Sequence, residues 1–286
     1  MLRRFALVFI LVFSTFSFAQ VSGDTYFAPL DQWRAALQSG EMTKFAELYS
    51  TIPPVEIVAR PVNQAGAENE VAFWNGIRKA GLHDLQVELF SQKDSPGGKV
   101  LSVHINFKTD TPAGLRTRYV LYQQLWQKQG DVWRIRKLQH SDLLKMQQPS
   151  RLNPHLYDTE VNAQEEINET VAKAFKDHKR IILMFGGNWC YDCHVLDNAF
   201  HQPDVAPLFE KNFYLIHVDI GTDGKKNRDL AAKYDTVLDK GVPALAILDT
   251  DGKVLMGQQN GEWESARSMD PDEIITFLNK WKPDAK

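Results

Sequence analysis

The sequence predicts two domains, an α+β domain with a curved antiparallel sheet followed by an α/β domain. A length of 286 residues is enough for two domains of about 150 residues each. Up to residue 146, helix-like spacing of apolar residues comes first and strand-like alternation follows. Beyond residue 158, strand and helix patterns alternate. Residues 147–157 include Pro149 and Pro154 and are interpreted as a linker.

The first 19 residues have the pattern of a secretory signal peptide. Arg3 and Arg4 form a basic start, an uncharged and mostly apolar run follows, and Ala19 offers a small-residue cleavage site before Gln20. An uncleaved anchor is the alternative, because the apolar run falls only a little short of a spanning helix. No later segment is apolar for long enough to span a bilayer. We therefore expect a soluble mature protein, periplasmic or secreted, in a compartment that permits disulfides.

Charge and cysteine content narrow the function classes. A net charge of −3 argues against a nucleic-acid binder, because phosphate contacts need clustered lysine and arginine. Two cysteines are too few for a scaffold held together by disulfides.

The first domain is placed at residues 24–146. Trp33, Leu37, Phe45 and Tyr49 lie at helical spacing, with Gly40 interrupting the pattern. Another helix is predicted over 70–80, and strands over 85–90, 100–107, 119–128 and 132–138, the last two joined by a hairpin turn at 129–131.

The segments "WRAALQSGEMTKFAELYS", "VAFWNGIRKAG" and "YQQLWQKQGDVWRIRKLQHSD" give residues 31–145 a resemblance to the NTF2-like (SnoaL-like) family. The resemblance implies a cone-shaped domain and a possible homodimer through it. The family includes enzymes, binding modules and dimerisation domains, so the fold alone decides little about function. Several side chains could line a pocket in the cone, although aromatic residues at these spacings are more often core: Trp74, His83, Asp84, His104, Tyr119, Tyr122 and Trp126.

The second domain is placed at residues 158–286 and is expected to fold on its own. Its most apolar stretch, residues 181–185, has the pattern of a central strand buried on both faces. Asp270, Pro271 and Glu273 form the start of a capped last helix that extends to about Trp281. Helices are also predicted over 166–178, from Cys190 and over 227–234, and strands over 213–219, 244–248 and 253–257.

Both cysteines lie in the motif Trp189-Cys190-Tyr191-Asp192-Cys193-His194. At a strand-to-helix junction, the first sulfur is placed at a helix N-terminus, where backbone N–H groups stabilise a thiolate. The second sulfur lies one turn further and can attack a mixed disulfide formed on the first. The spacing therefore indicates thiol–disulfide exchange.

The segments "IILMFGGNWCYDC", "FYLIHVDI" and "GVPALAILDTDGKVL" resemble the thioredoxin-like family over residues 166–282. The resemblance implies that Cys190 attacks, that Cys193 resolves, that Trp189 flanks the site, and that Val242-Pro243 is a cis-proline loop that pairs with the substrate backbone. Three features depart from the family pattern: Met184 stands where the buried acid is usual, Tyr191-Asp192 replaces the common Gly-Pro, and residues 221–240 are longer than in a minimal member.

The same residues allow other interpretations. Cys-x-x-Cys-His is also the haem c attachment signature, with His194 as the axial ligand. Cys190, Cys193, His194 and His201 could bind zinc, and the disulfide could be inert and structural. Asp192 is expected to be solvated and to raise the pKa of Cys190, and His194 to lie on the helix surface and to tune the thiols when charged.

We therefore expect an exported thiol–disulfide oxidoreductase, a disulfide reductase or interchange protein that needs no metal or cofactor. Its partners would be protein thiols and disulfides and a thiol protein that donates electrons. The alternative is a binding protein whose first domain holds a small ligand or partner and whose second domain is a docking platform. An active site in the first domain is a third possibility. Neither the direction of electron flow nor the substrate follows from the sequence.

Overall fold

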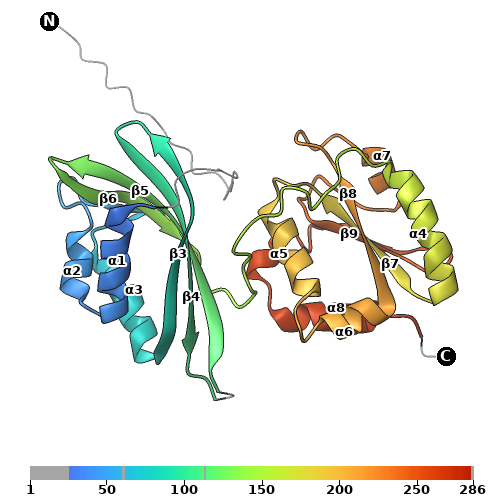
Figure 1. The fold of residues 1–286 in the computed structure, drawn as a ribbon, viewed down its shortest axis with the longest axis horizontal. Helices are drawn as coiled ribbons and strands as arrows, with labels where there is room; N and C mark the ends of the chain where they lie inside the picture. The colour runs from blue at the N-terminus through green and yellow to red at the C-terminus, as the bar shows by residue number, and fades with distance from the viewer. Residues whose placement is uncertain (1–25, 60–61, 113, 285–286) are drawn as a thin grey trace, which may run out of the picture.

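The structure is a computed structural model that describes residues 26–59, 62–112 and 114–284. The expected signal peptide lies outside the described residues. Across the described ranges, no helix combines the length and apolar character needed to cross a bilayer. Figure 1 shows the two predicted domains side by side, each with its own sheet.

The N-terminal domain is an α+β cone, as predicted. Its six-stranded sheet has the order β2-β1-β6-β5-β4-β3, and three helices cover one face of it (Figure 1). Shifts of register between β3 and β4 and between β5 and β6 mark bulges, which bend and twist strands and so curve the sheet. The elements are α1 (Ala28–Ser39), α2 (Met42–Glu47), β1 (Glu56–Ile57), β2 (Gln64–Ala65), α3 (Glu68–Lys79), β3 (Leu82–Ser95), β4 (Gly98–Thr109), β5 (Arg116–Gln129) and β6 (Val132–His140).

The C-terminal domain is α/β, and its sheet has the order β10-β9-β7-β8. The central strand β7 runs parallel to β8 and antiparallel to β9, and its buried run from Ile181 to Gly186 confirms the prediction of a strand covered on both faces. The elements are α4 (Ala163–Asp177), β7 (Arg180–Gly186), α5 (Tyr191–Phe200), α6 (Ala206–Asn212), β8 (Phe213–Asp219), α7 (Arg228–Lys233), β9 (Ala244–Leu248), β10 (Val254–Gly257), the 3₁₀ turn η1 (Ala266–Ser268) and α8 (Pro271–Trp281).

Local sequence signals set the ends of several elements. Gly40, with a φ of 78°, separates α1 from α2 as predicted. Asp270 and Glu273 form the predicted capping box of α8. The short elements β1, β2, α6 and η1 were not predicted.

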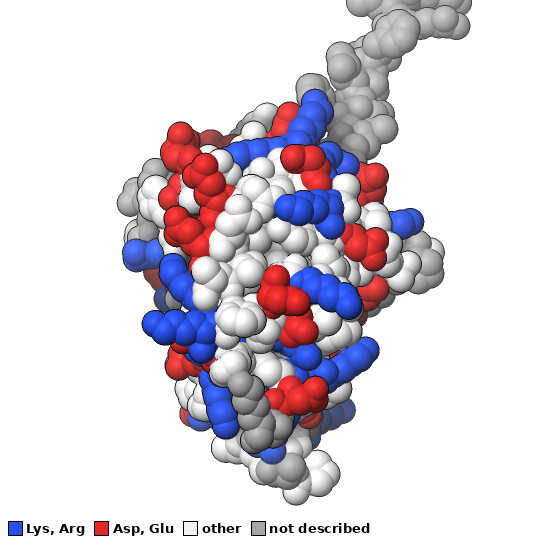
Figure 2. Space-filling model, turned by 90° about the vertical axis from the view of Figure 1, so that its right-hand side faces the viewer, with Lys and Arg blue, Asp and Glu red and all other residues white. Residues whose placement is uncertain are grey.

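The outer surface of the C-terminal domain carries charges of both signs. Figure 2 shows acidic and basic side chains interspersed around an uncharged strip on the face of the molecule that this domain forms. This distribution agrees with the small net charge of the chain.

The two domains meet at the outer face of the N-terminal sheet, where the cysteine motif itself makes contact. Phe90 of β3 stacks on His104 of β4 with their ring centroids 4.0 Å apart. Tyr191, which lies between the two cysteines, stands edge-on to both rings at 6.1 and 5.9 Å. Leu121 of β5 belongs to the same buried apolar cluster as the cysteines. The N-terminal domain therefore covers one side of the motif.

The interpretation of residues 147–157 as a plain linker needs a correction. The segment has no helix or strand, but Gln148, Leu152 and Tyr157 are buried. The Gln148 side chain accepts a hydrogen bond from the Tyr191 hydroxyl at 3.0 Å and donates one to the Arg267 carbonyl at 3.2 Å. The segment is thus part of the C-terminal core and of the domain interface, because its apolar side chains complete the cluster around the cysteines.

The buried His104 makes the interface sensitive to acid. Burial lowers the pKa of His104 to about 3, and the nearby Arg267 charge adds to this effect. A hydrogen bond with the Pro149 backbone acts in the opposite direction. An unfolded histidine titrates near pH 6.5. Between these values the unfolded chain binds the extra proton, so His104 contributes stability above about pH 6.5 that is lost as the pH falls toward 3.

His104→Phe keeps an aromatic ring but cannot take up a proton. Between pH 6.5 and 3 we expect its free energy of unfolding to fall less steeply with pH than that of the parent, by up to about 1.4 kcal/mol per pH unit. Urea unfolding of the variant and the parent at a series of pH values measures the difference. His155→Phe, at an exposed histidine, is the matched control and should follow the parent. If the free energy of unfolding depended on pH equally in all three proteins, this account of the interface would be contradicted.

Candidate functional site: a disulfide at the start of a helix

The two cysteines form a disulfide at the N-terminus of α5. Strand β7 ends at Gly186, and Cys190 is the N-cap of the helix, where its Sγ accepts the Cys193 N–H at 3.1 Å. Cys190 is 5% exposed and Cys193 is fully buried, so Cys190 is the more accessible cysteine of the pair. The start of the helix thus directs the Cys193 N–H at the Cys190 sulfur, where it stabilises a thiolate after reduction.

The Val242–Pro243 loop faces the disulfide. The bond between these residues is cis, which confirms the prediction. The Cys190 Sγ lies 3.6 Å from the Val242 carbonyl oxygen. Pro243 is buried and Val242 is partly exposed. Residues 52 positions apart in the sequence thus form one surface at the Cys190 sulfur.

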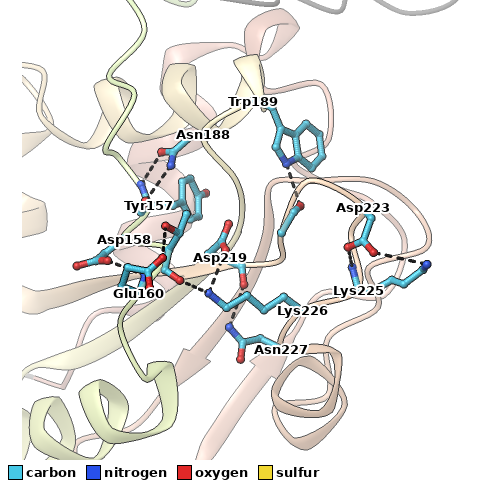
Figure 3. A network of polar contacts seen from close by, with 12 residues as sticks. Tyr157, Asp158, Glu160, Asn188, Trp189, Asp219, Asp223, Lys225, Lys226 and Asn227 are labelled. Carbon is cyan, nitrogen blue, oxygen red and sulfur yellow. Dashed lines mark hydrogen bonds and ion pairs between the residues drawn. The ribbon is translucent and has the colours of Figure 1, made fainter.

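Trp189 flanks this surface and is 45% exposed. Its indole N–H donates to the Gly221 carbonyl at 3.0 Å (Figure 3). A Cβ on Gly187 would lie 2.6 Å from the same indole nitrogen, so this position needs a glycine for the ring to lie there. The long segment 221–240 noted in the sequence thus begins at the residue that holds Trp189.

The expectation of a solvated Asp192 is wrong. Asp192 is 5% exposed and accepts the Arg267 Nε–H at 2.9 Å and the Arg267 backbone N–H at 2.8 Å, and it also forms an ion pair with Nη2. The Arg267 guanidinium lies over the Tyr191 ring, 4.8 Å from its centroid. Because a cation opposes the Asp192 charge at close range, Asp192 does not act on Cys190 as a lone negative charge.

His194 also differs from the expectation of a surface residue. It is 4% exposed, and its Nε2 lies 3.0 Å from the Asn188 carbonyl. A carbonyl only accepts hydrogen bonds, so Nε2 carries the proton. Burial lowers the pKa of His194, against the hydrogen bond to Asn188, so the ring is neutral near pH 7 and supplies no positive charge to the thiols.

The haem and zinc interpretations gain no support from the geometry. Cys190 and Cys193 bind each other, His194 binds a backbone carbonyl, and the His201 Nδ1 lies 2.7 Å from the Asp197 carbonyl. Within the ranges that the structure describes, no group of three or more His, Cys, Asp or Glu side chains could hold a metal ion.

The sequence analysis missed three residues at the site: Arg267, Asn188 and Tyr157. Arg267 lies 75 positions from Asp192, and no local pattern connects the two. Asn188 directly precedes the motif, and its side chain pairs with the backbone of Tyr157 through two hydrogen bonds. Tyr157 lies in the segment interpreted as a linker. The apolar neighbours Leu152 and Leu156 were the available signal that this segment is packed.

The aromatic residues of the first domain form core rather than a lined pocket, as the sequence analysis favoured. Trp74, Tyr122 and Trp126 are fully buried. The Tyr122 hydroxyl donates to the buried Glu70 at 3.0 Å and accepts from the Trp74 indole at 3.0 Å. By contrast, His83 lies at the surface, 3.1 Å from Asp110.

Comparison with known proteins identifies a family for part of the C-terminal domain. Residues 162–250 match the family model described as thioredoxin-like, so this part of the chain is a thioredoxin-like domain. A solved disulphide isomerase from Xylella fastidiosa is 31% identical, with 44% of this chain and 95% of that chain covered and a TM-score of 0.41.

The N-terminal part is similar to solved NTF2-like structures. An NTF2-like protein of unknown function from Shewanella oneidensis is 17% identical, with 40% of this chain and 94% of that chain covered and a TM-score of 0.34. A ketosteroid isomerase-like protein from Erwinia carotovora is 10% identical, with 40% and 90% covered and a TM-score of 0.33.

Proposed function

We propose that the protein is an exported thiol–disulfide oxidoreductase that reduces or interchanges disulfides in other proteins. The observation that carries the proposal is the Cys190–Cys193 disulfide at the N-cap of α5, with the Cys190 sulfur against the Val242–Pro243 loop. The basic and apolar start of the chain supports export. Export is tested separately by sequencing the N-terminus of the mature protein, which is expected to begin at Gln20.

The chemistry runs in two balanced steps. In the reduced protein, the Cys190 thiolate attacks a substrate disulfide, one substrate sulfur leaves as a thiolate, and a mixed disulfide forms. Cys193 then attacks the Cys190 sulfur, the substrate's second sulfur leaves, and the Cys190–Cys193 disulfide forms. Two electrons pass to the substrate. A thiol protein that donates two electrons restores the reduced pair.

The surroundings of the disulfide support one direction of approach. On one side of the disulfide, Tyr191 packs against Phe90 and His104 of the N-terminal domain. Trp189 and Val242 lie on the exposed side. We infer that a substrate chain lies along Val242 and Trp189 and that the N-terminal domain influences which substrates fit. A homodimer through the N-terminal domain would use surface other than the part that covers Tyr191.

Reduction of insulin disulfides by a small dithiol tests the activity. The native protein is expected to accelerate the reaction, and Cys190→Ser is expected to reduce the rate to that of the dithiol alone, because the attacking sulfur is gone. Thermal unfolding of the variant shows whether it is folded. A native protein no faster than the dithiol alone would contradict the proposal and favour the binding-protein alternative.

Reductase and oxidant are distinguished by the reduction potential of the Cys190–Cys193 pair, equilibrated against glutathione. We expect a value near that of thioredoxin, about −270 mV, for a reductase. A value near −120 mV, typical of a strong oxidant, would contradict the reductase assignment.

A further inference from the structure

Tyr157 places a buried hydroxyl beside the resolving cysteine. The residue is 1% exposed, and within the described part of the chain its hydroxyl has no hydrogen-bond partner. A Cβ built on Gly186 would lie 2.5 Å from the Tyr157 hydroxyl and 2.5 Å from the Cys193 Sγ. The two atoms are therefore separated by at most twice that distance, and Gly186 leaves the space between them free of a side chain.

The backbone of Tyr157 is fixed to the loop that carries the cysteines. The Tyr157 N–H donates to the Asn188 Oδ1 at 2.8 Å, and the Asn188 Nδ2 donates to the Tyr157 carbonyl at 2.9 Å (Figure 3). On the other side, the Tyr157 ring stands edge-on to His217, 5.1 Å between centroids. A buried hydroxyl on a backbone held this firmly, with no partner among the described residues in the oxidised state, calls for an explanation.

The charges around Tyr157 keep its hydroxyl protonated. Burial raises the pKa of Tyr157 well above its usual range, and the carboxylates of Asp197 and Asp219 add to the effect. Asp197 is paired with His217 at 3.0 Å, and Asp219 is paired with the Lys226 Nζ at 3.2 Å. The hydroxyl can therefore donate a hydrogen bond throughout the neutral range.

Cys193 needs such a donor. It is fully buried in an apolar cluster that includes Met184, and burial disfavours the thiolate that must form before it can attack. Met184 cannot accept a proton or donate a hydrogen bond.

We propose that the Tyr157 hydroxyl donates a hydrogen bond to the Cys193 sulfur and stabilises its thiolate while the mixed disulfide is resolved. The inference rests on the proposed exchange function. The Cys193 proton passes to solvent, the thiolate attacks the Cys190 sulfur, the bond between Cys190 and the substrate breaks, and the substrate sulfur leaves. Tyr157 keeps its proton and is not consumed.

Single turnover with dithiobis(nitrobenzoate) separates the two steps, because one coloured thiolate is released by the attack of Cys190 and a second by the attack of Cys193. We expect Tyr157→Phe to leave the first phase unchanged, to slow the second about tenfold and to raise the pH midpoint of the second phase by about one unit, as expected for loss of a hydrogen bond to a charged group. Tyr234→Phe removes the hydroxyl of another largely buried tyrosine, in the cluster that does not contain the cysteines, and is the matched control. It should change neither phase.

A ring-fluorinated tyrosine at position 157 keeps the ring and strengthens the donor, so it should speed the second phase, and it provides a second route if Tyr157→Phe does not fold. An unchanged rate and pH midpoint of the second phase in a folded Tyr157→Phe protein, or a slower second phase with fluorotyrosine, would overturn the inference. Failure of the native protein to release either thiolate would instead refute the proposed function itself.

Discussion

Replacing Arg267 with methionine is expected to lower the free energy of unfolding by about 3–5 kcal/mol, because it leaves the buried Asp192 charge without its partner. The side chains of Asp192 and Arg267 are only 7% and 17% exposed, so water compensates little for the loss. Methionine retains much of the apolar contact with Tyr191. Urea unfolding followed by tryptophan fluorescence measures the change.

The same substitution at an exposed ion pair provides the control. Arg228 pairs with Asp239 at 2.7 Å, but these side chains are 48% and 76% exposed. Arg228→Met should therefore cost no more than about 1 kcal/mol. Equal losses in the two variants would mean that the pair beside the cysteines behaves as an ordinary surface pair.

Removing the N-terminal half at residue 158 is expected to unfold the C-terminal domain, although the sequence alone places the domain boundary there. Such a fragment lacks Leu144, Met146, Leu152 and Tyr157, each at most 5% exposed and each part of the cluster around the cysteines. Burying a large apolar side chain contributes about 1.5–3 kcal/mol, so four of them approach the whole stability of a typical domain.

A fragment that starts at Ser141 keeps these four side chains and is expected to melt cooperatively. Circular dichroism during heating distinguishes the two fragments. If the fragment from 158 melted at the same temperature as the one from 141, the linker segment would not be part of the core.

Sequence reasoning succeeds where the residues that decide a structure are close together in the chain. Strand β7, the start of α5 at Cys190 and the capped α8 depend on residues close together in the chain, so their patterns were visible. The cis bond before Pro243 followed from family resemblance rather than from local physics.

Long-range pairing explains the failures. The local sequence suggests that Asp192 is solvated, but the fold places Arg267 of η1 against it. It likewise suggests that His194 is exposed, but the fold places the Asn188 carbonyl against its ring. Tyr157 lies in a stretch with two prolines and no periodicity. Its apolar neighbours Leu152 and Leu156 indicate that the segment is packed, but they do not indicate that it packs against the cysteine cluster.

The most direct test of the central claim is to trap the mixed disulfide. Cys193→Ser is incubated with a disulfide-bonded protein, and the mass and position of the adduct are determined by peptide mapping. Because Cys190 is the accessible sulfur at the helix N-cap, we expect a stable adduct on Cys190, and we expect Cys190→Ser to form far less adduct on the buried Cys193. Equal adducts on the two cysteines, or none on Cys190, would contradict the assignment of Cys190 as the attacking residue.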